Sequence, residues 1–155
     1  MIIVWFFLWL IPLQASIAQV DASSQINDRD IINLINIERS KNSLGELVFN
    51  DTLRDLAILK TNDMKNNGYF DHYSPDGRGL KYFLNAVKYD YAVAGENLAI
   101  NFYDDNEVVQ AWMNSKSHRF NILHPDFTEV ALAHDYIMLN GKNQFVITLI
   151  FGKRK

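Results

Sequence analysis

Ala94-Gly95-Glu96-Asn97-Leu98-Ala99 places a carboxylate beside a glycine within an otherwise apolar stretch. Upstream, the turn-rich loop from Phe70 to Gly77 carries His72, and downstream the segment from Ala111 to Arg119 ends a predicted helix. A carboxylate among apolar residues needs polar partners, because an unpaired charge is costly to bury. We therefore expect the loop, the glutamate and the helix end to converge on one polar cleft.

The first 18 residues have the pattern of a secretory leader. An unbroken apolar run from Ile2 to Leu10 is followed by Pro12 and by the small residues of Ser16-Ile17-Ala18. The run is shorter than the roughly 20 apolar residues that span a bilayer. We expect residues 1–18 to be a cleaved signal peptide, with an uncleaved membrane anchor as the alternative. Residues 19–27 are then a polar linker, and residues 28–152 form one domain.

Composition narrows the class of protein. The 155 residues carry 15 basic and 18 acidic side chains, a net charge of −3, and no dense basic run appears before the last three residues. This argues against nucleic acid as a partner. The chain has no cysteine, which excludes disulfides, thiolate catalysis and Cys-ligated zinc. An exported domain without disulfides is typical of a bacterial envelope protein.

Apolar residues at helical spacing predict helices over residues 28–41, about 51–67, 80–87 and about 105–115, with a further turn over 118–123. Asp28 is expected to cap the first helix, and Asn50 or Asp51 the second. Asp104-x-x-Glu107 is a capping box for the fourth.

After Phe127, apolar residues recur at every second position, as in β-strands. Residues 128–138 and 144–151 flank Leu139-Asn140-Gly141-Lys142, and Asn-Gly is the strongest short hairpin signal. The second strand is apolar on both faces, so both faces must be covered. Helices upstream and a mostly antiparallel sheet at the end predict an α+β fold with helices on each side of the sheet.

His72 and Glu96 are the first candidates for chemistry. An imidazole can ligate a metal or act as a general base, yet His72 can equally be an exposed loop residue. Glu96 can pair with His72, or it can accept backbone N–H bonds in a purely structural role. We predict that the two side chains are neighbours, with Ser115 or Asn114 close enough to orient them.

Other polar side chains could line the same cleft. His118 can face the cleft or interact with the helix dipole at a C-terminus, and Glu129 can project inward or lie at a solvent-exposed edge. His134 falls too far along its strand to join them. Trp112, on the inner face of its helix, is expected in the core. The chain has no nucleophile elbow, phosphate loop, His-Glu-x-x-His or EF-hand pattern.

Together these motifs resemble the bacterial branch of the CAP superfamily, which contains cysteine-rich secretory proteins, antigen 5 and plant pathogenesis-related proteins. The matching segments are Phe70 to Gly77, Gly95 to Ala99, Trp112 to Leu123 and Phe127-Thr128. The resemblance covers about Asp28 to Gly152. It implies a three-layer α-β-α sandwich, an extracellular location, and a cleft with two histidines and two acidic residues. In some members this cleft holds a divalent metal.

Two cleft positions depart from the family pattern. His72 and Glu96 match the first family histidine and glutamate, but Lys116 stands where bacterial members often have Glu, and Glu129 where they often have His. Because an ammonium repels a dication, we hypothesise that a Lys116–Glu129 bridge replaces the metal. Alternatively, Lys116 extends into solvent and Glu129 lies at the strand edge. No cofactor is then expected, and His72 is the one weak candidate for a metal ligand.

Three functions follow from the sequence. The first is a secreted or envelope-bound binding module for a lipid, glycan or peptide. The second is a metal-assisted or acid–base hydrolase with His72 and Glu96 as its catalytic residues. The third is a structural or adhesion domain. We favour the binding module, with a ligand site at His72, Glu96, Asn114, Ser115, Lys116, His118 and Glu129, and contact with the membrane only through an uncleaved leader.

Overall fold

A computed structural model describes residues 26–155 of the chain. The predicted leader and most of the predicted linker therefore lie outside the described residues. The elements in chain order are α1 (Asp28–Lys41), β1 (Val48–Phe49), α2 (Asp51–Asn67), α3 (Leu80–Ala86), β2 (Tyr91–Ile100), α4 (Asp105–Asn114), α5 (Lys116–Ile122), β3 (Glu129–Leu139) and β4 (Lys142–Arg154). None of these helices is long and apolar enough to cross a membrane.

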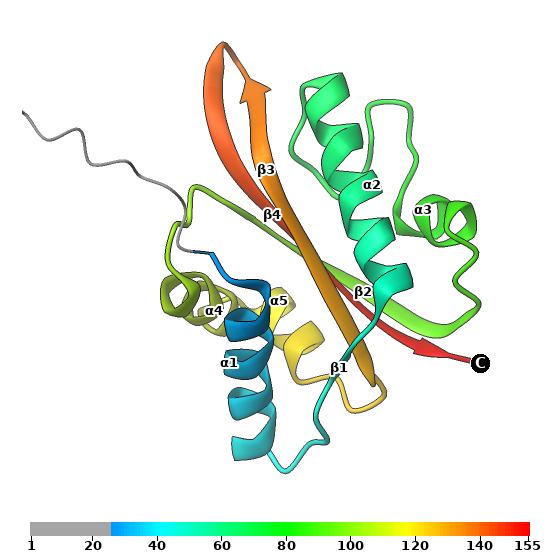
Figure 1. Cartoon of the computed structure of the whole chain (residues 1–155), viewed down its shortest axis with the longest axis vertical. Helices are drawn as coiled ribbons and strands as arrows, with labels where there is room; N and C mark the ends of the chain where they lie inside the picture. The colour runs from blue at the N-terminus through cyan, green and yellow to red at the C-terminus, as the bar shows by residue number, and fades with distance from the viewer. Residues whose placement is uncertain (1–25) are drawn as a thin grey trace, which may run out of the picture.

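The strands form one sheet in the order β1-β3-β4-β2. β1 runs parallel to β3, and the other two pairings are antiparallel. Figure 1 shows α1, α4 and α5 on one side of the sheet and α2 and α3 on the other. The predicted α+β class and the three-layer α-β-α sandwich are confirmed.

β4 joins the two layers because both of its faces are apolar. Phe145, Ile147, Leu149 and Phe151 belong to the core shared with α1 and α4. Ile150 packs with α2 and α3 on the opposite face. The alternation predicted from the sequence is thus confirmed, and it places β4 at the centre of the fold.

The ends of the elements follow local side-chain chemistry. The side chain of Asn27, rather than that of Asp28 as predicted, accepts a hydrogen bond at the start of α1. Asn50 and Asp104 cap α2 and α4 through the N–H groups of Leu53 and Glu107. At the β3–β4 turn, Asn140 and Gly141 both have positive φ, 51° and 74°, as a two-residue type I′ hairpin requires.

Trp112 fixes α4 to the sheet. Its side chain is 2% exposed, and the indole N–H donates to the carbonyl of Leu98 on β2 over 3.1 Å. The predicted core position of this residue is confirmed. Ser115 has an extended backbone with ψ of 125°, so the chain turns there, and the expected extra turn after α4 is a separate helix, α5.

Candidate functional site

His72 and Glu96 are in contact, as predicted. Glu96 lies on β2 with its side chain 4% exposed, and His72 reaches it from the α2–α3 loop with its ring 50% exposed. The distance between His72 Nδ1 and Glu96 Oε1 is 2.6 Å. The pair therefore joins a buried carboxylate to an imidazole that solvent can reach.

A polar network holds the loop that carries His72. The carboxylate of Asp63 on α2 accepts hydrogen bonds from Ser74 Oγ at 2.7 Å and Arg78 Nη2 at 2.9 Å, and it also accepts one from the Tyr69 hydroxyl. These partners lie on both sides of His72 in the sequence. One carboxylate thus fixes both arms of the loop.

Lys60 of α2 adds a buried positive charge beside the pair. Its side chain is 0% exposed, and Nζ donates to the carbonyl of His72 at 3.1 Å and to the hydroxyl of Tyr69 at 3.0 Å. Burial lowers the pKa of Lys60, while the charge of Glu96 acts to raise it. This ammonium orients the loop and offsets the charge of Glu96.

Asparagine side chains connect α5 to β2 behind the pair. Asn121 Nδ2 donates to the backbone carbonyl of Glu96 at 3.1 Å and to Asn97 Oδ1 at 2.9 Å. Asn97 Nδ2 in turn donates to the carbonyl of His118 at 3.1 Å. A side chain at Gly95 would bring its Cβ within 2.8 Å of the Phe127 ring, so a glycine is needed for this close approach.

The two histidines differ in their electrostatics. The hydrogen bond to Glu96 raises the pKa of His72 above its ordinary value, although burial opposes the shift. Burial lowers the pKa of His118, and the charge of His72 lowers it further. The backbone carbonyl of His118 is bonded to Asn97, the residue next to Glu96, so we include His118 in the site.

Glu96 leaves one polar atom unused. Its second carboxylate oxygen, Oε2, is buried and has no hydrogen-bond partner within residues 26–155. Buried polar atoms are nearly always paired with protein or water. Because this oxygen is shielded from solvent, the half-exposed imidazole of His72 is the part of the pair that a group from outside the protein can reach.

The expectation that Asn114 or Ser115 orients the pair is wrong. The Ser115 hydroxyl lies 3.3 Å from the Ser117 hydroxyl, and Asn114 is exposed at the end of α4. The second contacts come from Lys60 and Asn121 instead.

The hypothesised Lys116–Glu129 bridge is also wrong. Glu129 accepts a hydrogen bond from Asn50 Nδ2 at 2.7 Å and another from the Tyr89 hydroxyl, and Arg154 Nε lies 3.8 Å away. Lys116 is exposed and pairs with no carboxylate among the described residues. Glu129 starts β3 and makes these contacts instead, so no Lys116–Glu129 bridge forms among residues 26–155.

Sequence reasoning missed Lys60 and Asn121. Lys60 shares the apolar period of α2 with Leu56 and Met64, and a lysine in such a stripe signals a buried partner. Asn121 carries no comparable signal, because an asparagine on a short helix is usually solvated.

Two pockets, one beside the start of α1 and one beside α3, have neither His72 nor Glu96 in their lining. His134 lies apart from the site, as predicted, with its Nε2 atom 3.6 Å from Asp28 Oδ1.

A divalent metal does not fit these residues. Among residues 26–155, no three His, Cys, Asp or Glu side chains lie close enough together to hold a metal ion. One oxygen of Glu96 is already bonded to His72, and the ammonium of Lys60 would repel a dication. The lysine that shapes the site is thus Lys60, not Lys116.

Known proteins share this architecture. Over 107 residues the chain is 39% identical to the uncharacterised protein YkwD of Bacillus subtilis, covering 69% of this chain and 42% of that protein. It is 34% identical to an extracellular protein of Bacillus anthracis with an SCP domain, with a TM-score of 0.69 over 83% of this chain and 40% of the other. An outer surface protein of Borrelia burgdorferi is 26% identical, with a TM-score of 0.68 over 82% and 92% of the two chains.

The chain spans less than half the length of the Bacillus relatives described above. It matches the model of the cysteine-rich secretory protein family over residues 32–151, which contains β2, the loop with His72 and α5. The chain therefore belongs to the cysteine-rich secretory protein (CAP) family.

Proposed function

We propose that this chain is an exported binding module in which His72, Glu96 and His118 hold a polar group of a ligand of the cell envelope or extracellular space. The observation that carries the proposal is the pair itself: the His72 side chain is 50% exposed, while its Nδ1 atom lies 2.6 Å from the buried carboxylate of Glu96. A ligand would bind through the free ring nitrogen of His72, and the carboxylate orients and polarises that ring.

The chemistry of the site favours a glycan or a peptide over a lipid tail. Both offer several hydrogen-bonding groups, whereas an alkyl chain offers none for His72. The imidazole of His72 can donate or accept through its free nitrogen, depending on its tautomer. A ligand with adjacent donors and acceptors, such as a sugar ring or a peptide bond, matches these groups.

Export is supported by the relatives. One solved structure is described as an extracellular protein with an SCP domain, and another as an outer surface protein. These descriptions agree with the leader predicted from the sequence.

The test is a ligand titration of the full chain, monitored by NMR. Panels of soluble oligosaccharides and short oligopeptides are titrated while the signals of His72, Glu96 and His118 are monitored. We expect one panel to shift these signals together. Glu96→Gln should weaken binding about tenfold or more, because a hydrogen bond to a charged group contributes about 1.5–3 kcal/mol.

Glu107→Gln is the matched control. Glu107 is an exposed carboxylate on α4, so its replacement should leave binding unchanged. Binding that is equally strong in Glu96→Gln, or shifts confined to other regions, would reject the proposal.

A further inference from the structure

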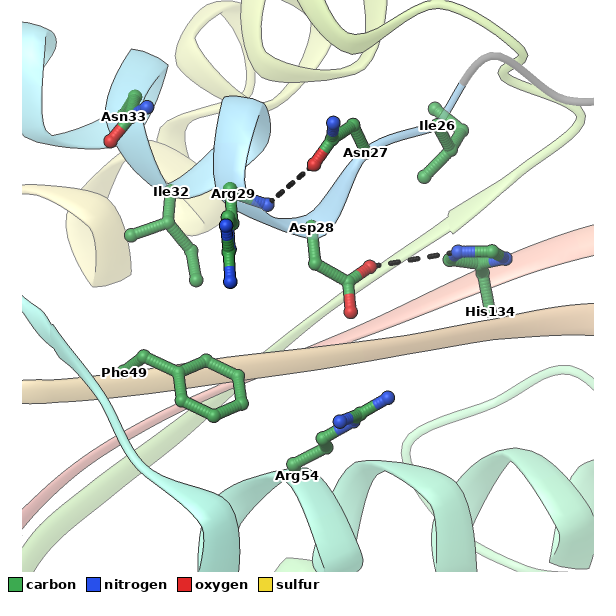
Figure 2. Close-up of a pocket in the computed structure, with 9 residues that line it drawn as sticks. All are labelled: Ile26, Asn27, Asp28, Arg29, Ile32, Asn33, Phe49, Arg54 and His134. Carbon is green, nitrogen blue, oxygen red and sulfur yellow. Dashed lines mark hydrogen bonds and ion pairs between the residues drawn. The ribbon is translucent and has the colours of Figure 1, made fainter.

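A second polar site lies beside the start of α1, in a pocket of about 900 Å³ that does not include His72 or Glu96. Four elements supply its walls: Asp28 and Arg29 come from α1, Phe49 from β1, Arg54 from α2 and His134 from β3. Figure 2 shows the side chains of Asp28 and Arg29 extending from α1, and that of Arg54 from α2, toward the same space. Charged groups from separate parts of the chain therefore meet in one pocket.

Two positive charges in this pocket have no internal partner. Arg29 and Arg54 form no ion pair with any carboxylate of residues 26–155, and Asp28 is the one carboxylate in the lining. The ion pair that Asp28 makes among the described residues is with His134, at 3.6 Å. Two guanidiniums and one carboxylate give the pocket a net positive charge even when His134 is neutral. The pocket is therefore complementary to an anion.

Asp28 adds a hydrogen-bond acceptor beside the two guanidiniums. Its Oδ1 atom is shielded from solvent and lies near His134, whereas the side chain as a whole is 29% exposed. Figure 2 shows the second oxygen, Oδ2, pointing into the space between α1 and α2. Burial raises the pKa of Asp28, although the charges of His134 and Arg54 oppose the shift. A hydroxyl that donates to Oδ2 would offset part of the cost of this burial.

The arrangement of the two guanidiniums favours a phosphate over a carboxylate. A carboxylate has two oxygens, and the fork of a single guanidinium occupies both of them. A phosphate ester presents three acceptor oxygens, so two guanidiniums can share it. Arg29 and Arg54 reach the pocket from different helices. This placement matches an anion with more than two acceptor oxygens.

Asp28 and Phe49 restrict what the phosphate is attached to. The carboxylate of Asp28 repels a bare phosphate, but it attracts a hydroxyl that lies next to the phosphate. The ring of Phe49 is 42% exposed, and it offers an apolar wall for a carbon skeleton. The ligand that satisfies all of these groups carries a phosphate and a hydroxyl on one skeleton.

We propose that this pocket binds a phosphate group carried on a polyol or a sugar. Arg29 and Arg54 hold the phosphate, and Asp28 accepts a hydrogen bond from a neighbouring hydroxyl. The carbon skeleton packs against Phe49. This proposal is independent of the function assigned to His72 and Glu96.

The test is a titration of the full chain with glycerol phosphate and with glucose phosphate, monitored by NMR at Arg54 and His134. Inorganic phosphate, glycerate and glycerol are the comparison probes. We expect saturable shifts with the two hydroxylated phosphates. Inorganic phosphate and glycerate should bind about tenfold more weakly, since the first is repelled by Asp28 and the second lacks the third acceptor oxygen. Glycerol, which has no charge, should not bind.

Variants test the role of each group. Arg29→Gln and Arg54→Gln should each weaken the binding of glycerol phosphate about tenfold, because each removes a charge-assisted hydrogen bond. Asp28→Asn should reduce the preference for glycerol phosphate over inorganic phosphate, because it removes the repulsion of the bare anion. A purely structural role of Asp28 would weaken the binding of both probes equally. Lys116→Gln removes an exposed cation outside the pocket and is the matched control.

Other outcomes would overturn the proposal. These are no saturable binding of either hydroxylated phosphate below about 10 mM, equal affinity for inorganic phosphate, or an equal loss of binding in Lys116→Gln. Glycerate that binds as tightly as glycerol phosphate would overturn the assignment of the anion as a phosphate. When the hydroxylated phosphates bind as expected, the one with the higher affinity shows whether the skeleton is that of a polyol or of a sugar.

Discussion

The two edges of the sheet meet the same requirement in different ways. At the outer edge of β2, side chains satisfy the backbone carbonyls: Asn121 Nδ2 donates to Glu96 and Trp112 Nε1 to Leu98, each over 3.1 Å. At the outer edge of β3, β1 pairs with two residues and then α2 begins. An unpaired edge is a template for another strand unless it is covered.

The difference lies in what covers the backbone. At the β2 edge, side chains of α4 and α5 bond to the carbonyls beside Glu96, and Lys60 fixes the loop that carries His72. At the β3 edge beyond β1, Leu132 is fully buried, so packing rather than side-chain hydrogen bonding covers this part of the backbone.

The largest effect should come from removing the indole that covers the β2 edge. Trp112→Ala leaves a cavity and an unpaired carbonyl at Leu98, and we expect it to cost about 3–5 kcal/mol. Phe49→Ala on β1, at the opposite edge of the sheet, should cost less than about 1 kcal/mol. Urea unfolding followed by circular dichroism compares the two. Similar losses for both variants would mean that the edges are equally important for stability.

A smaller effect should follow from breaking the network behind the His72 loop. Asp63→Asn removes the charge that accepts hydrogen bonds from Tyr69, Ser74 and Arg78, and should cost about 1.5–3 kcal/mol. Asp55→Asn, an exposed change on the same helix, is the control and should cost almost nothing. Thermal melts of the two variants at neutral pH measure the difference.

The same network predicts that the stability of the fold depends on pH. Burial acts to raise the pKa of Asp63, but the hydrogen bonds from Tyr69 and Ser74 and the charge of Arg78 lower it below 3.8. Its stabilisation is therefore present above about pH 3.8 and is lost as the pH falls through the folded pKa. The difference in the free energy of unfolding between wild type and Asp63→Asn should therefore decrease as the pH falls over that range. A difference that stays constant would contradict the stabilising role of the Asp63 charge.

The smallest change in stability should come from replacing Lys116. Because this side chain is exposed and unpaired with any described carboxylate, Lys116→Ala should change stability by less than about 0.5 kcal/mol. Lys60→Met, on the buried side of the pair, should disturb the signals of His72 in NMR spectra, whereas Lys116→Ala should not. A larger effect of Lys116→Ala would restore the bridge that the structure excludes.

Much of the fold could be predicted because its signals are local. The Asn-Gly turn, the capping box at Asp104 and the double apolar alternation of β4 each specify an element through short-range chemistry. Boundaries were less predictable: Asn27 takes the cap expected at Asp28, since both residues are good caps and only tertiary contacts choose between them.

The site could be predicted only in part. The contact of His72 with Glu96 followed from their motifs, but the Lys116–Glu129 bridge was wrong, because Glu129 bonds to Asn50 and Tyr89 instead. Asn121 could not be found, since its partners are backbone and side-chain groups on a distant strand. Which polar groups meet depends on how elements dock, and no local pattern encodes that.

The measurement that tests the account most directly is an NMR pH titration of the histidines in wild type and in Glu96→Gln. We expect His72 to titrate above 6.5 and His118 below it, and we expect Glu96→Gln to lower the pKa of His72. Because folding raises the pKa of His72, the stabilisation is complete below about pH 6.5 and is lost as the pH rises through the folded pKa. If His72 titrates identically in both proteins, the pair does not exist in solution, and the proposed ligand site would be contradicted.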